Sequence, residues 1–159
     1  MAATHLATYL NDHLAGAVVG LELAEHLESA HAGTSVGSFA AQLKADIASD
    51  RRELEELMAK NNISASRPRK AAAWLSEKLT ELKLRLDDPA GGALRLLEVL
   101  DGLSTGIEGK RLLWRALASA AVPGLTMADY QRLQERAEDQ RRRVEEQRLE
   151  AAKAGLTTD

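Results

Sequence analysis

The sequence predicts an all-α protein folded as one domain. It has 159 residues, enough to bury a single sizeable core. Aromatic residues make up 3% of the chain and only three prolines occur, whereas Ala, Leu, Glu, Arg and Lys are abundant, a balance that favours helices over strands. Apolar residues also recur three and four positions apart, which is the spacing of one helix face.

The first two helices are predicted at residues 4–31 and 35–60. Thr4 is a suitable N-cap for the first, and the sequence AGTS at 32–35 interrupts its pattern. The apolar faces consist of Leu6, Leu10, Leu14, Ala17, Leu21 and Ala24 in the first helix, and of Val36, Phe39, Leu43, Ile47, Leu54 and Leu57 in the second. Because the connection is short, we expect an antiparallel hairpin.

Three further helices are predicted at residues 67–86, 90–119 and 126–154. Ser66 caps the shorter third helix, with Pro68 in its first turn. DDPAGG precedes the fourth helix and AVPGLT follows it. The fifth helix is highly charged, and its thin apolar face begins at Met127.

Three glycines, Gly102, Gly106 and Gly109, share one face of the predicted fourth helix. Each glycine inside a helix costs about 0.8 to 1 kcal/mol relative to alanine. We therefore expect another backbone to approach this face, either the third helix, which carries Trp74, or a second subunit. A break in the helix near Gly102 is the alternative.

The segment 61–89 has the length of a crossover connection. Helices of 26 to 30 residues are roughly 40 Å long, so a chain that returns to the starting end of the bundle needs about that reach. Two antiparallel hairpins joined by a long crossover form the ferritin-like arrangement. The fold class expected is thus a ferritin-like four-helix bundle over residues 1–159, with a shorter helix in the crossover.

Three stretches carry a resemblance to known proteins: YLNDHLAGAVVGLELAEHL at 9–27, RKAAAWLSEKLTELKL at 69–84 and GIEGKRLLWRAL at 106–117. Together they resemble a group of bacterial ferritin-like proteins over nearly the whole chain. The resemblance implies this fold but no particular reaction.

In the wider ferritin-like superfamily, a dinuclear iron or manganese site takes one Glu from each of two helices and a Glu-x-x-His motif from each of the other two. This sequence departs from the pattern, because all four histidines precede residue 32. Its one Glu-x-x-His is Glu28 to His31, at the end of the first helix. The last helix has Glu138-x-x-Arg141 instead, and a guanidinium has no lone pair for a metal.

Helical projection predicts an interior polar network in place of the metal. Asp50 falls inside the apolar stripe of its helix, Glu108 lies on a polar stripe of the fourth helix, and Arg141 interrupts the stripe of the fifth. We expect Arg141 to face Asp50 or Glu108. His13 also projects onto an apolar stripe and is predicted to be a buried, hydrogen-bonded histidine.

The alternative is a metal site built from acidic residues and one histidine. Glu22, Glu25 and Glu28 form an i, i+3 ladder, which is usually a solvated flank, but with His31 they offer oxygen and nitrogen donors. The candidate ligands are Glu22, Glu25, Glu28, His31, Glu53 and Glu108. Iron or manganese would be the metal of an oxidase or storage protein, whereas the first interpretation predicts no cofactor.

A match to the nucleophile motif G-x-S-x-G occurs at Gly33 to Gly37. That motif works at a strand-to-helix turn, but here it joins two helices. We therefore interpret Ser35 as an N-cap, and no catalytic residue is predicted.

Composition narrows the remaining classes of function. The chain has no cysteine and a formal charge of −3, so neither thiolate chemistry nor binding to nucleic acid or anionic membranes is expected. No secretion signal or membrane-spanning run is recognisable, which predicts a cytoplasmic protein. We expect a structural or interaction protein that forms a homo-oligomer, preferably a dimer; a regulatory protein with an unidentified protein partner is a further interpretation.

Overall fold

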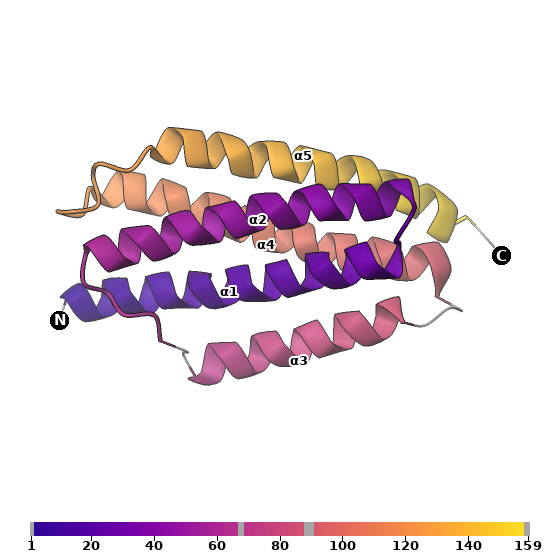
Figure 1. Cartoon of the computed structure of the whole chain (residues 1–159), viewed down its shortest axis with the longest axis horizontal. Helices are drawn as coiled ribbons and strands as arrows, with labels where there is room; N and C mark the ends of the chain where they lie inside the picture. Colours follow the sequence, from indigo (N-terminus) through magenta and orange to yellow (C-terminus); the bar gives the residue numbers. More distant parts are fainter. Residues whose placement is uncertain (1, 67–68, 88–90, 158–159) are drawn as a thin grey trace.

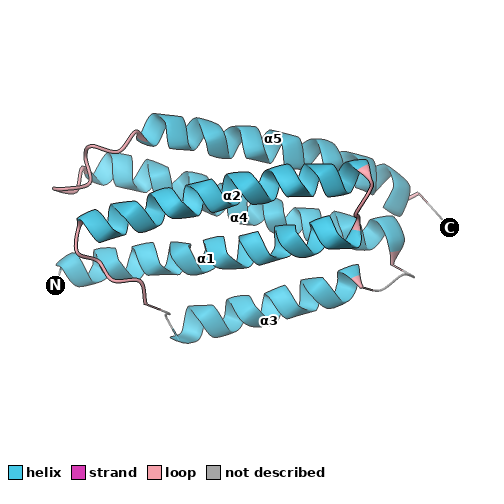
Figure 2. Ribbon diagram, viewed as in Figure 1, coloured by secondary structure: helices cyan, strands magenta, loops and turns pink. Residues whose placement is uncertain are grey.

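The computed structural model describes residues 2–66, 69–87 and 91–157, and these residues contain helices but no strand. The chain is all-α (Figure 2). The described residues form five helices: α1 (Ala2–Ala30), α2 (Ser35–Lys60), α3 (Arg69–Leu86), α4 (Gly92–Ala120) and α5 (Tyr130–Gly155). The predicted starts of the third and fourth helices, at 67 and 90, and the N-terminal role of Pro68 lie outside the described residues.

The helices form two antiparallel hairpins, α1 with α2 and α4 with α5, joined by a crossover that contains α3 (Figure 1). As a result α2 and α4 run in the same direction. The most extensive packing is within the two hairpins, and α3 lies outside the four long helices against α1 and α4. No described helix is long and apolar enough to cross a membrane.

Side-chain caps fix the starts of α2 and α5. Thr34, not Ser35 as predicted, is the N-cap of α2, and its hydroxyl accepts a hydrogen bond from the Gly37 backbone N–H at 3.2 Å. Position 37 has no room for a side chain, because a Cβ there would collide with the His31 carbonyl. This local packing accounts for the second glycine of the G-x-S-x-G match.

Helix α5 begins at Tyr130, four residues later than predicted, because Asp129 caps it. The Asp129 carboxylate accepts from the Arg132 backbone N–H at 3.0 Å. Met127 therefore precedes the helix and is 93% exposed. The prediction that Met127 belongs to the apolar face of this helix is therefore wrong.

Helix α4 is continuous from Gly92 to Ala120, so the predicted alternative of a break near Gly102 is wrong. The third helix approaches only the first of the three glycines: a Cβ on Gly102 would lie 3.2 Å from the Leu82 side chain of α3. A Cβ on Gly106 or Gly109 would meet no other described atom within 4 Å. These two glycines face open space in the single chain.

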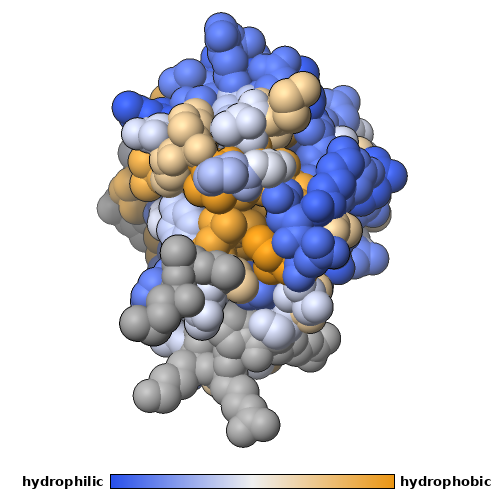
Figure 3. Space-filling model, turned by 90° about the vertical axis from the view of Figure 1, so that its left-hand side faces the viewer, coloured by the Kyte–Doolittle hydropathy of each residue, from blue (hydrophilic) through white to orange (hydrophobic). Residues whose placement is uncertain are grey.

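The buried apolar residues form two clusters, one toward each end of the bundle. On α2 and α4, the first cluster stops at Ile47 and Ile107, and the second begins at Leu54 and Leu113. The second cluster reaches the end of the bundle where α1 starts, and apolar surface is visible there (Figure 3). Partly buried Leu6, Ile63 and Val122 pack against this cluster.

Candidate functional site

A layer of polar side chains separates the two apolar clusters near the middle of the bundle. Its centre is Asp50 of α2, whose side chain is 3% exposed. Asp50 follows Ile47 and precedes Leu54 on the buried face of α2, so its carboxylate points into the bundle. A carboxylate in such a place requires hydrogen bonds and opposite charge to remain ionised.

Lys110 of α4 supplies the charge closest to Asp50. Its Nζ lies 2.5 Å from Asp50 Oδ2, and it also donates a hydrogen bond to Gln140 Oε1 of α5. The lysine side chain is only 15% exposed. Burial lowers the pKa of Lys110 below its usual value, while the charge of Asp50 and the hydrogen bond with it act in the opposite direction.

Gln140 completes the centre of the layer from α5. Its buried Nε2 donates to Asp50 Oδ2 at 2.8 Å, the same oxygen that Lys110 contacts. The amide thus accepts from the ammonium and donates to the carboxylate. The neutral amide therefore satisfies both the ammonium and the carboxylate by hydrogen bonds. It adds no third charge to the interior, where charges are costly.

Arg136 of α5 connects this centre with the surface. One of its guanidinium nitrogens lies 2.9 Å from Asp50 Oδ1 and the other donates to Glu53 Oε1 at 2.6 Å. The contact with Asp50 is ionic but poorly aligned, because Oδ1 has no hydrogen-bond partner among the described residues.

Arg132 forms the outer end of the same layer and contacts Glu53 through both terminal nitrogens, at 3.1 and 2.6 Å. Such forked pairing is a strong form of ion pair. The hydrogen bond from Arg132 is the main reason why the pKa of Glu53 is lowered, and burial opposes it.

The layer therefore contains three cations and two carboxylates, drawn from α2, α4 and α5. We use the name polar layer for Asp50, Glu53, Lys110, Arg132, Arg136 and Gln140. Its cationic nitrogens have no lone pair to offer a metal ion. Chemically, the arrangement favours a fixed ion-pair network that aligns three helices rather than an open set of ligands.

The expected interior position of Arg141 is wrong, although the structure does pair it with Glu108. Their side chains are 39% and 31% exposed, and Arg141 contacts Glu108 Oε2 at 2.9 Å. Glu108 also accepts two hydrogen bonds from Arg111, at 2.8 and 2.7 Å. These bonds are the main cause of its lowered pKa. This cluster lies on the half-exposed side of α4.

Lys110 is a member of the polar layer that the sequence reasoning did not predict. A usable signal was nevertheless present. Lys110 follows Ile107 by three positions and precedes Trp114 by four, so it occupies the apolar stripe of α4.

His13 lies outside the polar layer, in contrast to its predicted membership of the interior network. It is on α1, half-buried, with its ring edge-on to Tyr9 at 4.7 Å between centroids. Burial lowers the pKa of His13, and the neighbouring Asp12 charge partly opposes this.

The candidate metal ligands on α1 do not converge. Glu28 pairs with Lys44 of α2, and Glu22 lies 3.5 Å from Lys83 of α3. Glu25 is exposed, and His31 lies just beyond the end of α1. Across residues 2–66, 69–87 and 91–157, no three His, Asp or Glu side chains group as metal ligands.

The two remaining candidates are separated as well. Glu53 belongs to the polar layer, where it is held by Arg132 and Arg136, and Glu108 is held by Arg111 and Arg141. A metal bound at either position would first have to displace two guanidinium groups.

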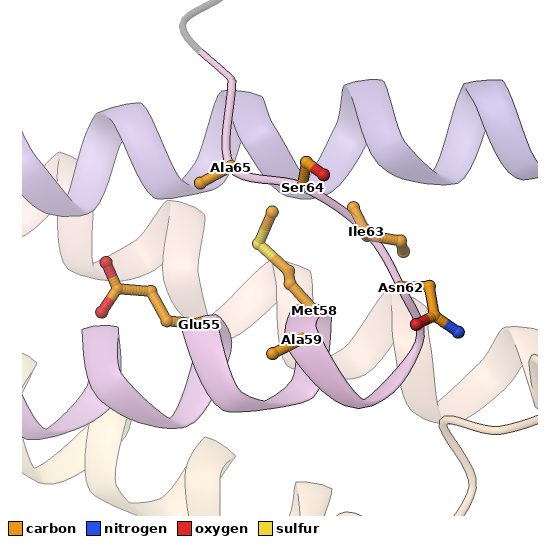
Figure 4. A pocket seen from close by; sticks show the side chains of 7 residues that line it. All are labelled: Glu55, Met58, Ala59, Asn62, Ile63, Ser64 and Ala65. Atoms are coloured by element: carbon orange, nitrogen blue, oxygen red, sulfur yellow. The ribbon is translucent and has the colours of Figure 1, made fainter.

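A hollow of about 730 Å³ lies where α2 ends and the crossover begins (Figure 4). The Met58 side chain points toward the loop at the start of the crossover, on which Ser64 and Ala65 lie. The lining residues are Glu55, Met58, Ala59, Asn62, Ile63, Ser64 and Ala65. Glu55 is the only charged group among them, so this hollow offers no constellation of reacting groups.

No family model, no curated protein and no solved structure matches this chain.

Proposed function

We propose that this chain is a ferritin-like bundle without an intact dinuclear metal site, and that it acts as a structural or interaction protein. The proposed fold family is supported by the helix order. Two antiparallel hairpins are joined by a crossover, and α2 and α4 are consequently parallel. An up-down-up-down bundle with short loops would instead make neighbouring helices antiparallel throughout.

The observation that carries the proposal is the position of the Lys110 ammonium. It lies between Asp50 of α2 and Gln140 of α5, where side chains from three facing helices meet. Metal sites of bundles use side chains that project inward from facing helices. Here a protein cation satisfies the buried carboxylate, and a bound metal ion would meet electrostatic repulsion from Lys110 and Arg136.

The interaction role is supported by the outer face of α4. Gly106 and Gly109 are open, and Leu112, three residues after Gly109, is 48% exposed. Of the three glycines on α4, only Gly102 is approached by α3. Close approach by a second subunit is the remaining explanation for glycine at positions 106 and 109. The proposal therefore includes a homodimer that packs through α4.

Elemental analysis of the purified protein tests the absence of a metal site. We expect iron, manganese and zinc to remain far below one ion per chain, even after incubation with each metal and gel filtration. One tightly held ion per chain would contradict the proposal.

Two double variants would then assign such an ion. Its loss in Glu25→Gln/His31→Ala would establish the rival metal-binding function with a site on α1. Its loss in Glu53→Gln/Glu108→Gln would place it nearer the middle of the bundle. Circular dichroism of both variants is the control for folding.

A further inference from the structure

A second hollow, of about 320 Å³, lies between α1, α2 and α3. Its surface is mainly apolar on two sides, with Leu14, Val18 and Val19 on α1 opposite Leu75 and Leu79 on α3. This volume is at the lower end of the range of small-molecule pockets, roughly 300 to 1,000 Å³. The hollow is independent of the polar layer and of the proposed function.

A buried asparagine fixes one end of this hollow. Asn11 of α1 donates to the Ser64 carbonyl at 3.2 Å, and its own side-chain oxygen accepts from the Ser66 backbone N–H at 2.6 Å. These two bonds hold the start of the crossover on α1, so Ala65 and Ser66 form a fixed end wall. Asn11 is itself buried and uses both ends of its amide.

Ion pairs fix α3 at its other end. Arg85 lies 2.7 Å from Glu98 of α4, and Asp87, just after α3, lies 3.0 Å from His26 of α1. The crossover is therefore attached at both ends, while α3 packs on α1 and α4. The space toward α2 remains as a hollow between the three helices.

The charges at the rim are already paired with one another. Arg51 donates to Glu55 at 3.0 Å, both on α2, and Glu22 is close to Lys83. A charged ligand would lose hydration without gaining an unpaired partner, which is unfavourable. The hydroxyl-bearing residues Ser66 and Ser76 also line the hollow, and they suit an uncharged polar group.

The hollow is large enough for a small molecule.

We propose that this hollow binds a small, uncharged, mainly apolar molecule with one hydroxyl-type polar group, such as a medium-chain alcohol. The apolar part lies between Val18 and Leu79, and the polar group faces the serines. The driving force is removal of apolar surface from water.

A fluorescence titration tests this site with N-phenyl-1-naphthylamine, an uncharged apolar probe, and three eight-carbon competitors. We expect saturable binding of one probe per chain. 1-Octanol should displace it at lower concentration than octanoate or octylammonium, because the paired rim charges favour neither ion. Absence of saturable binding would overturn the proposal, and equal displacement by the ions would overturn the uncharged ligand class.

Matched variants assign the binding to this hollow. Ala15→Phe places a ring in it and should abolish saturable binding, whereas Ala45→Phe makes the same change on the exposed side of α2 and should bind like the wild type. Retained binding in Ala15→Phe would contradict the site. If that variant is unfolded by circular dichroism, Val18→Ser gives the same test by making the floor polar.

Methyl NMR of the wild-type chain provides a readout without substitutions. Addition of 1-octanol should shift the methyl signals of Val18 and Leu79 but not those of Val144, which is buried in α5. Shifts confined to residues outside the hollow would refute the assignment.

Discussion

Lys110 and Asp50 are 60 positions apart in the chain, yet the ammonium of one lies 2.5 Å from the carboxylate of the other inside the bundle. Asp50 has a second cationic neighbour, Arg136, at 2.9 Å. Lys110 has Gln140 as its only other described hydrogen-bond partner. The two members of the pair therefore depend on each other unequally.

This inequality predicts the effect of breaking the pair from either side. Asp50→Asn leaves Lys110 and Arg136 without a buried counter-charge, a loss of about 3 to 5 kcal/mol by analogy with other broken buried pairs. Lys110→Met should cost less, because Arg136 still neutralises Asp50. Urea unfolding measures both, and a larger loss in Lys110→Met would contradict the geometry described above.

The double variant Asp50→Asn/Lys110→Met completes a thermodynamic cycle. Since both charges are removed together, its free energy of unfolding should be closer to wild type than the sum of the single losses. Additive losses would mean that the two residues do not interact. Lys153→Met, which breaks an exposed pair with Glu150, is the control and should have little effect.

A second prediction concerns stability in acid. The pKa of Glu53 is lowered in the folded chain, chiefly by Arg132. The deprotonated carboxylate is therefore more favourable in the folded chain than in the unfolded one. Its contribution is present above the ordinary glutamate pKa of about 4.3 and is lost as pH falls through the lower folded value.

Chemical unfolding between pH 6 and pH 3 checks this sign. Wild type should lose stability below about pH 4.3, and Glu53→Gln should show a shallower loss over the same interval. The exposed Glu56, on the same helix, provides the control variant Glu56→Gln. An equal slope in wild type and Glu53→Gln would exclude this role for Glu53.

A third prediction follows from the position of His13 beside Tyr9. Burial lowers the pKa of His13 and the Asp12 charge raises it. The imidazole should therefore titrate below the ordinary value of about 6.5, and Asp12→Asn should lower its pKa further. The unfolded chain binds the proton more readily than the folded chain does. The contribution of His13 to the free energy of unfolding should therefore decrease as pH falls through that range. NMR titration measures the value, and an upward shift in Asp12→Asn would contradict the assigned cause.

The two tryptophans predict a contrast in stability. Trp114 is 1% exposed and Trp74 is 59% exposed. Trp114→Ala should cost about 3 to 5 kcal/mol by leaving a cavity, whereas Trp74→Ala should change stability by less than about 0.5 kcal/mol.

Trp114→Phe refines the same contrast. The indole N–H of Trp114 has no hydrogen-bond partner among the described residues, so removing it relieves a penalty of about 1 to 3 kcal/mol for a buried unpaired donor. The phenyl variant should lose clearly less stability than the alanine variant, because it also leaves a smaller cavity. Equal losses in thermal or urea unfolding would contradict this expectation.

The helices could be predicted from local signals, because period, caps and breakers act over a few residues. The start of α5 shows the limit: the apolar residue Met127 extended the pattern, but Asp129 capped the helix later and left Met127 in solvent. The buried places of Asp50 and Gln140 follow from helical projection. Which cation meets Asp50 depends on how far a flexible side chain reaches between helices, and projection of single helices contains no such distance.

The last prediction separates two kinds of glycine. At Gly37 a Cβ would collide with a backbone carbonyl, so Gly37→Ala should destabilise the chain. At Gly106 and Gly109 the space is open. In an isolated chain, alanine at either position should therefore raise helix stability by about 0.8 to 1 kcal/mol.

If α4 forms the proposed dimer, those same alanines would prevent close approach of the second subunit. We expect Gly106→Ala/Gly109→Ala to lower the dimer fraction in light scattering during chromatography, while its monomer unfolds at higher urea concentration than wild-type monomer. Gly16→Ala, which also faces open space but on α1, should stabilise the chain without changing the dimer fraction. A wild-type protein that stays monomeric at every concentration, or a dimer insensitive to the double variant, would show that α4 is not the subunit interface.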